Sequence, residues 1–201
     1  MGRQQFEQMY ESRPAWDTGR PQPAIVVLAE SGRIRGRVLD VGCGTGENVL
    51  YLAAKGYDTW GIDFVPSAIE QAKAKAAARK IDAHFLLANA LELAKLGQQF
   101  DTVIDCGLFH TFSDEERPAF VASLAHVLPS SGLLHILCFS NEEPGEYGPR
   151  RISQDDLRGA FQGNWQVKNI EATRFEAVTR PDGPQHSPGG PKAWLATIER
   201  T

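Results

Sequence analysis

Val38-Leu39-Asp40-Val41-Gly42-Cys43-Gly44-Thr45-Gly46 is the stretch on which the fold of this chain depends. Its first four residues form a short apolar run that carries one carboxylate, and such a run predicts a buried strand. The three alternating glycines predict a sharp turn in which the backbone can approach a ligand closely. A helix predicted from Asn48 to Lys55, stopped by Gly56, would direct its N-terminal amides at that ligand.

A second carboxylate follows at the distance that a nucleotide-binding βαβ unit requires. A strand predicted from Tyr57 to Ile62 is followed by Asp63, about twenty residues past the first glycine. In such units this carboxylate hydrogen-bonds the ribose hydroxyl groups. The glycine turn alone would also fit a purely structural role, but the turn and Asp63 together predict a nucleotide site.

The spacing of the glycines bears on which nucleotide is bound. The dinucleotide fingerprint has a glycine three residues after its second one, and Glu47 occupies that position here. Asp40 also puts a charge on a strand end that dinucleotide folds usually keep apolar. A nucleotide-dependent oxidoreductase on a Rossmann-type sheet is therefore an alternative that both residues disfavour.

The pattern resembles motif I of the class I S-adenosylmethionine-dependent methyltransferases. The resemblance implies an α/β fold with a Rossmann-like, doubly wound seven-stranded sheet, mostly parallel with an antiparallel last strand, and helices on both faces. It implies S-adenosyl-L-methionine as cofactor, with Asp63 on the ribose and Asp40 helping, through its loop, to hold the methionine end. The expected cofactor-binding residues are Trp16, Asp40, Gly42, Cys43, Gly44, Gly46, Asp63, Phe64, Asn89, Ala90 and Asp105.

The remaining segments fit the same sheet. Further strands are predicted over residues 84–88, 100–106, 133–139, 166–175 and 193–199, and helices over 23–31, from Pro66 or Ser67, after a Ser113–Glu116 capping box and from Ser153. A loop is expected over 180–191. The family pairs its last two strands antiparallel at the sheet edge, whereas a dinucleotide fold continues with crossovers.

The N-terminal residues are aromatic and polar, and the sheet does not need them. Trp16-Asp17-Thr18-Gly19-Arg20-Pro21 resembles the Trp–Gly–Pro pattern of the thiol and thiopurine methyltransferase group. The resemblance implies that residues 1–35 form a lid of helices over the cofactor, with the S-adenosylmethionine-binding domain over 36–201, in one compact unit. The alternative is an N-terminal helix that only packs on the edge of the fold.

The end of the third predicted strand departs from the family pattern. In the family an acidic residue there often takes the adenine amino group, with the backbone of the next residue beside the ring. This chain has Asn89, followed by Ala90. An amide oxygen accepts the same hydrogen bond without charge assistance, so we expect the adenine contact to be kept.

The loop after the fourth predicted strand is expected to face the methyl group, because open α/β sheets bind ligands at the carboxyl ends of their strands. It lacks the Asn/Asp-Pro-Pro-aromatic signature of enzymes that methylate adenine or glutamine nitrogen. His110 is the only histidine in this loop and is the predicted catalytic residue, as base or as orienting group. The expected substrate-binding residues are Arg20, Phe109, Phe112 and Arg150, with core packing or surface ion pairs as the alternative roles.

Length and composition restrict the class of protein. A chain of 201 residues with 42% hydrophobic content supports one full-sized core. A net charge of -4 and a pI near 5.7 argue against a nucleic-acid partner. The sequence contains no apolar run of membrane-spanning length and no signal peptide, so we expect a cytoplasmic protein without a membrane partner. Its three cysteines lack metal-ligand spacing, so no metal site is expected. We expect a monomer or homodimer.

The sequence thus predicts a methyltransferase that transfers a methyl group from S-adenosylmethionine to O, S or N of a small molecule. The transfer is an in-line displacement, so the protein mainly aligns the acceptor lone pair behind the methyl carbon. Because no base is obligatory in such a reaction, a catalytically silent S-adenosylmethionine-binding protein is a third hypothesis.

Overall fold

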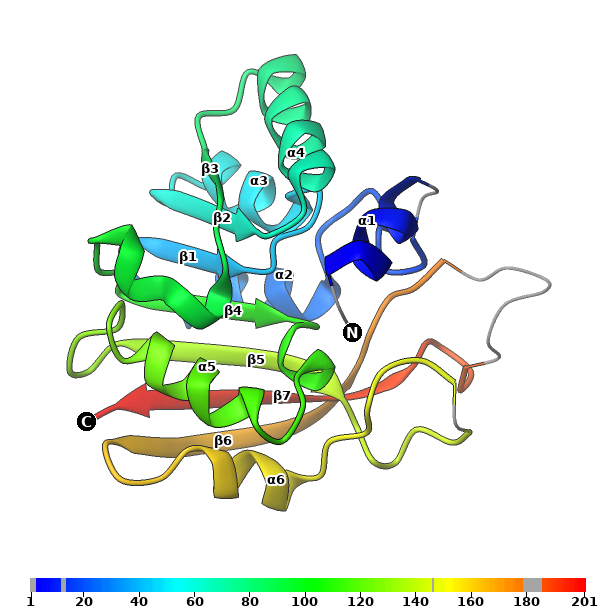
Figure 1. Cartoon of the computed structure of the whole chain (residues 1–201), viewed down its shortest axis with the longest axis vertical. Coiled ribbons are helices and arrows are strands. Elements are labelled where there is room, and N and C mark those ends of the chain that lie inside the picture. The colour runs from blue at the N-terminus through cyan, green and yellow to red at the C-terminus, as the bar shows by residue number, and fades with distance from the viewer. Residues whose placement is uncertain (1–2, 12–13, 146, 179–185) are drawn as a thin grey trace.

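The protein is built on one seven-stranded sheet with the strand order β3-β2-β1-β4-β5-β7-β6 (Figure 1). The computed structural model describes residues 3–11, 14–145, 147–178 and 186–201. The strands are β1 (Val38–Val41), β2 (Thr59–Asp63), β3 (His84–Leu87), β4 (Thr102–Cys106), β5 (Leu133–Phe139), β6 (Trp165–Arg174) and β7 (Lys192–Arg200). Only β7 runs antiparallel to its neighbours, so the predicted sheet is confirmed.

Helices cover both faces of the sheet, as predicted. They are α1 (Arg3–Glu11), α2 (Pro23–Glu30), α3 (Glu47–Ala54), α4 (Pro66–Arg79), α5 (Glu116–Leu124) and α6 (Gln154–Ala160), with 3₁₀ turns η1 (Ala90–Leu96) and η2 (Phe109–Thr111). Apolar residues of α5, α6 and η1 pack in one cluster with the sheet, whereas those of α2, α3 and α4 form two clusters on the other side. Burial of these apolar faces is the main force that holds the layers together.

The helix starts show how the local sequence sets the element boundaries. Ser153 and Asp156 form a reciprocal capping box at the start of α6. Ser113 and Glu116 make the same two contacts before α5, with the Glu116 N–H donating to Ser113 Oγ at 3.2 Å and the Ser113 N–H to Glu116 Oε2 at 2.9 Å. The predicted Ser113–Glu116 box and the predicted helix start at Ser153 are confirmed, and each box satisfies amide groups that a helix start leaves unpaired.

The strand register brings the functional segments to one edge. Val41 pairs with Ile62 on one side and with Asp105 on the other, and Asp105 pairs with Ile136. The carboxyl ends of β1, β2, β4 and β5 therefore lie together. We call this the carboxyl edge, and the opposite one the amino edge. In Figure 1 the N-terminal segment and the loops that follow β4 and β5 gather at the carboxyl edge, on the right.

The sequence-based boundaries differ from the structure by a few residues. Strand β2 begins at Thr59 and β4 at Thr102, each two residues later than predicted. The 3₁₀ turn η1 was not predicted; it begins after Asn89, whose side chain accepts the Leu91 N–H. Of the loop expected over 180–191, residues 180–185 lie outside the described part of the chain.

Candidate cofactor and acceptor site

The glycine turn has a geometry that only glycine accepts without strain. Gly42, Gly44 and Gly46 have φ values of 72°, 54° and 85°. A Cβ atom on Gly46 would lie 2.7 Å from the Phe85 ring, and one on Gly44 would lie 2.7 Å from the Tyr10 hydroxyl. The turn thus combines left-handed backbone conformations with close approach on both sides, which explains the alternating glycines.

Asp63 closes the turn from the end of β2. Its Oδ2 accepts the Gly44 N–H and its Oδ1 accepts the Val65 N–H, both at 2.9 Å. The side chain is only 7% exposed, and burial raises its pKa although these hydrogen bonds favour the charged form. The carboxylate that the sequence assigns to the ribose therefore lies directly against the glycine turn.

Asp40, one strand away, is a buried carboxylate with no hydrogen-bond partner for either oxygen among the described residues. Burial is the main cause that raises its pKa to about 8, and the nearby Asp105 adds to the effect, while Asn48 opposes it. A buried acid that lacks a partner is costly unless something else supplies one. The positively charged methionine end of S-adenosylmethionine would supply such a partner. The glycine turn, which has no side chains, would leave room for it.

Asp105 is also fully buried, and burial raises its pKa to about 7. Its Oδ1 accepts the N–H groups of Leu108 and Phe109 at 2.9 and 3.1 Å. The observed role of Asp105 is therefore to shape the loop after β4. Direct contact with the cofactor stays a prediction.

The N-terminal segment covers the glycine turn. The Phe6 ring lies edge-on to the ring of Phe64, the residue directly after Asp63, with 5.6 Å between the ring centroids. The Trp16 indole N–H donates to the Tyr10 hydroxyl at 3.2 Å, and that hydroxyl faces Gly44. Burial and the nearby Asp63 raise the pKa of Tyr10 far above its usual value. Tyr10 is a site residue that the sequence analysis did not single out.

The same segment is attached to both halves of the sheet. On the cofactor side Asp17 Oδ2 accepts the Thr45 hydroxyl at 3.1 Å, and Thr45 in turn accepts from Lys75 at 2.7 Å. On the other side Arg20 forms an ion pair with Glu176. Gln22 exchanges two 2.8 Å hydrogen bonds with the Glu176 backbone. These contacts span the glycine turn, α4 and the residues after β6.

Three further predicted cofactor residues lie around the turn. Asn89 is exposed at the end of β3 and uses its side-chain oxygen to cap η1, with Ala90 buried behind it. The Cys43 Sγ packs against Gly61 of β2, where an added Cβ atom would lie only 2.8 Å from it. The Cys43 side chain therefore points away from the ligand side. Only the backbone of Cys43 can therefore contribute to the site.

His110 lies at the carboxyl edge but is held as a hydrogen-bond acceptor. The Phe139 N–H donates to His110 Nδ1 at 3.0 Å, so the ring proton of the neutral form sits on Nε2. Burial, with Arg151 and Arg117 nearby, lowers its pKa to about 3. This arrangement contradicts a base at Nε2 and leaves that nitrogen as a donor, which keeps the orienting role open.

Phe109 and Phe112 pack among the core residues, and a contact of either ring with the acceptor stays a prediction. Phe109 is fully buried between Phe120 and Phe161, and Phe112 packs against Phe120 with 4.8 Å between ring centroids. Both rings therefore lie near Phe120 of α5. Arg150 forms an ion pair with Asp114 at 2.8 Å, so the surface-pair alternative is the observed one.

A different aromatic cluster occupies the carboxyl edge beside His110. It consists of His110, Phe139, Phe175 and His186, with neighbouring ring centroids 5.3 to 6.0 Å apart. Phe139 ends β5, Phe175 follows β6, and His186 precedes β7. Phe139, Phe175 and His186 were not predicted, because they come from segments far apart in the chain and no local spacing records their contact.

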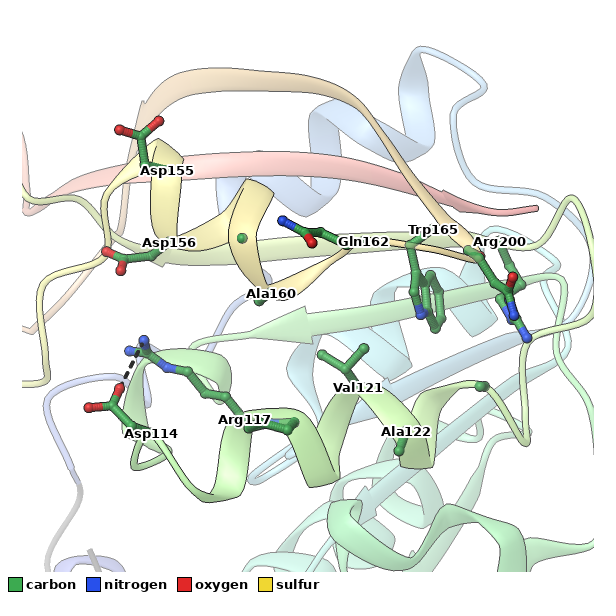
Figure 2. A pocket seen from close by; sticks show the side chains of 14 residues that line it. Asp114, Arg117, Val121, Ala122, Asp155, Asp156, Ala160, Gln162, Trp165 and Arg200 are labelled. Atoms are coloured by element: carbon green, nitrogen blue, oxygen red, sulfur yellow. Dashed lines mark hydrogen bonds and ion pairs between the residues drawn. The ribbon is translucent and has the colours of Figure 1, made fainter.

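A groove of about 780 Å³ lies elsewhere, between α5 and α6 (Figure 2). It contains Arg117, whose guanidinium reaches toward Asp114, together with Asp155, Asp156 and Arg200. None of its lining residues belongs to the glycine turn or the aromatic cluster. The covered cofactor site therefore does not coincide with this groove.

The described residues hold no group of three or more His, Cys, Asp or Glu side chains placed to bind a metal ion. Among the helices described, none has both the length and the apolar character that a membrane crossing requires.

Fold and site together define the class of protein. The chain belongs to the class I S-adenosylmethionine-dependent methyltransferases, and it is an enzyme whose cofactor is S-adenosylmethionine. A methyltransferase domain family matches residues 38–132, which contain the glycine turn, Asp63 and the loop after β4.

Individual relatives show which methyltransferases this chain is similar to. A 2-heptyl-1-hydroxyquinolin-4(1H)-one methyltransferase of Mycobacteroides abscessus is 34% identical over 169 residues, which are 83% of this chain and 74% of that protein. A solved structure titled for the conversion of a disulfide bond into a thioacetal group during echinomycin biosynthesis is 34% identical, with a TM-score of 0.89 over 98% of this chain and 92% of that one. The magnesium protoporphyrin IX methyltransferase of Synechocystis, at 21% identity and a TM-score of 0.66 over 89% of this chain and 76% of that one, shows the shared fold.

Proposed function

We propose that this enzyme transfers a methyl group to an ionisable hydroxyl group on a planar aromatic small molecule. The observation that carries the proposal is the aromatic cluster of His110, Phe139, Phe175 and His186 at the carboxyl edge. Rings in edge-to-face and tilted contact favour a flat apolar ligand. The relative that acts on 2-heptyl-1-hydroxyquinolin-4(1H)-one supports this acceptor class, because its named substrate is a bicyclic heterocycle with one hydroxyl group.

We infer that the cofactor is held at the glycine turn. Asp63 would accept hydrogen bonds from the ribose hydroxyl groups, and Asp40 would attract the positively charged methionine end. Asn89 and Ala90 would lie beside the adenine. Bound there, S-adenosylmethionine supplies an activated methyl group on a sulfonium. The buried setting of Asp40 and Asp63 supports the assignment, since charge interactions are stronger where water is excluded.

We further propose that residues 1–35 act as a lid on the domain formed by residues 36–201. The lid would wall the cofactor with Tyr10 and Trp16, and the Arg20–Glu176 ion pair would close it onto the acceptor side. A closed lid removes water from the reacting groups, which suits a step in which the sulfonium charge disperses. His110 would orient the acceptor through its Nε2–H.

Methylation of a sulfur atom is the second candidate. The solved structure with a TM-score of 0.89 carries a title that names sulfur chemistry. A probable thiol methyltransferase of Arabidopsis thaliana is 29% identical over 140 residues, which are 69% of this chain and 62% of that protein. A thiol has a pKa near 8.5, so it ionises more readily than a phenol and needs less help from a base.

The deciding experiment measures S-adenosylhomocysteine formation with matched acceptors. The panel contains 2-heptyl-1-hydroxyquinolin-4(1H)-one, 2-naphthol, 2-methoxynaphthalene and an aromatic thiol, with the Asp63→Ala variant as the control for cofactor use. We expect turnover of the two hydroxylated compounds and none of 2-methoxynaphthalene, which has no hydroxyl group. If only the thiol is methylated, the accepting atom is sulfur and not oxygen. If no compound is methylated, the proposal of a planar aromatic acceptor is refuted.

A further inference from the structure

Of the five histidines in the chain, two lie at the carboxyl edge. His84 starts β3 and stacks on Trp60, and His126 is exposed before β5, so both belong to the amino edge. His135 lies inside β5, with Nδ1 on Thr197 Oγ1 at 3.1 Å and Nε2 on the Arg33 carbonyl at 3.2 Å. Only His110 and His186 are therefore near the methyl-transfer region.

The polar neighbours of these two imidazole rings differ in a way that matters for proton transfer. His110 Nδ1 is committed to the Phe139 N–H, so its outward nitrogen carries a proton and cannot accept another. His186 has the opposite arrangement. Its Nδ1 faces a carboxylate oxygen, Glu143 Oε1, at 3.7 Å. A carboxylate in that position favours the tautomer with the proton on Nδ1, which leaves Nε2 free to accept one.

Glu143 is held rigidly for this task. It is 3% exposed, and its two oxygens accept the N–H groups of Ser187 and Lys192 at 2.9 and 2.8 Å. Arg151 Nε donates to the Glu143 carbonyl at 3.1 Å, and the same guanidinium binds the carbonyls of Pro149 and Tyr147. The hydrogen bonds from Lys192 and Ser187 keep the pKa of Glu143 below its usual value in spite of burial, so the carboxylate stays charged.

The position of His186 also fits an acceptor contact. Its ring stands edge-on to Phe139 at 6.0 Å, and on the Phe139 ring lie His110, Phe175 and the Arg151 guanidinium. The side chain is partly exposed, at 19%, whereas that of Glu143 behind it is fully covered. Among the described residues, the charged groups that face His186 are thus Glu143 directly and Arg151 across the Phe139 ring.

We infer that His186, oriented by Glu143, is the general base that deprotonates the acceptor hydroxyl. The inference rests on the proposed hydroxyl acceptor. The O–H bond breaks and its proton moves to His186 Nε2. The oxygen electron pair forms the new bond to the methyl carbon, while the electrons of the breaking carbon–sulfur bond stay on sulfur. The proton then passes from His186 to solvent, so the step needs no further reactant.

The test compares His186→Gln and His186→Ala with His126→Gln, a control histidine at the amino edge. With 2-heptyl-1-hydroxyquinolin-4(1H)-one and 2-naphthol at pH 7, we expect the His186 variants to lose about 10²-fold or more in kcat. Affinity for S-adenosylhomocysteine should change less than about twofold. The loss should shrink as pH approaches the pKa of the acceptor, about 10 for a phenol. Added imidazole should restore part of the activity of His186→Ala but not of Glu143→Gln, which keeps its own imidazole ring.

A second readout does not depend on turnover. In proton NMR, binding of the acceptor to the protein loaded with S-adenosylhomocysteine should shift the His186 Cε1–H resonance, assigned by its loss in His186→Gln, and leave that of His126 unchanged. Normal turnover in the His186 variants, or a His186 resonance that the bound acceptor does not move, would overturn the role of His186 and leave the proposed function intact. A wild-type enzyme that methylates no hydroxyl compound would overturn the proposed function and the inference with it.

Discussion

At the scale of single residues, Asp63 stabilises the fold with the same two oxygens that we propose bind the ribose. In the structure they accept the N–H groups of Gly44 and Val65. We predict that Asp63→Ala weakens S-adenosylhomocysteine binding by about 1–3 kcal/mol, because charged hydrogen bonds to the ribose are lost. Titration calorimetry measures this, with Asp58→Ala, an exposed carboxylate just before the same strand, as the control. Unchanged affinity in a folded Asp63→Ala variant would refute the ribose assignment.

Asp40 should make the stability of the free protein depend on pH. Its pKa is about 8 in the folded state, far above the unfolded value, so the folded protein binds the extra proton and loses stability as pH rises toward 8. The buried histidines His110 and His135 have lowered pKa values, and their effect is confined to pH below about 6.5.

The useful window for Asp40 is therefore pH 6.5 to 8. Asp105, whose pKa is about 7, titrates in the same window and adds to the effect. We predict that the free energy of unfolding falls by about 2–3 kcal/mol across this window, and that Asp40→Asn removes more than half of this fall. Urea titrations at several pH values provide the measurement, and Asp58→Asn should keep the wild-type slope. An equal slope in wild type and Asp40→Asn would place the titrating proton elsewhere.

His110 lies where a catalytic residue was predicted, but its hydrogen bond to Phe139 also stabilises the fold. We predict that His110→Leu lowers the free energy of unfolding by about 1–3 kcal/mol, because the buried Phe139 N–H loses its acceptor. His110→Asn, which can place an oxygen near the position of Nδ1, should lose less. Thermal and urea unfolding of the two variants make the comparison. Equal losses would show that packing against Phe139 and Phe175, and not the hydrogen bond, is what His110 contributes.

At the scale of elements, the N-terminal segment connects the two halves of the sheet without being part of it. We predict that a variant without residues 1–20 stays folded, because it keeps every strand and the helices from α2 onward. It should lose turnover, since Tyr10, Trp16 and Asp17 no longer cover the glycine turn. Circular dichroism, calorimetry with S-adenosylhomocysteine and turnover assays test this together. Normal turnover would remove the lid from the proposal, and an unfolded variant would make the segment part of the fold.

The elements also show which features the sequence could reveal. Strand β5 was predicted without error, and the glycine turn and Asp63 lie in contact at the carboxyl edge, because short-range spacing encodes both. The orientation of Phe109 and Phe112 could not be predicted, since it depends on the 3₁₀ turn that the buried Asp105 stabilises. Likewise Tyr10 over Gly44 and Glu143 beside His186 are contacts between distant segments, and no periodicity in the chain records them.

At the scale of the whole molecule, the cofactor site joins α1, the glycine turn, β2 and, through the N-terminal segment, the residues after β6. A ligand that binds only the folded state stabilises it by about 2.7 kcal/mol at a hundredfold excess over Kd. For a chain of 201 residues we expect the melting temperature to rise by about 5–10 °C with S-adenosylhomocysteine.

NAD at the same excess should give no comparable rise. Glu47 stands where a dinucleotide fold has its third glycine, and its carboxylate is bound by Lys75 and Arg79 at 2.8 Å. Its side chain therefore occupies the helix start that a pyrophosphate would need. Thermal shift measurements with both ligands, repeated on Asp63→Ala, test the specificity of the whole site. The Asp63→Ala variant should lose most of the shift with S-adenosylhomocysteine, and an equal shift with NAD in the wild type would contradict the assignment of the glycine turn to a single nucleoside.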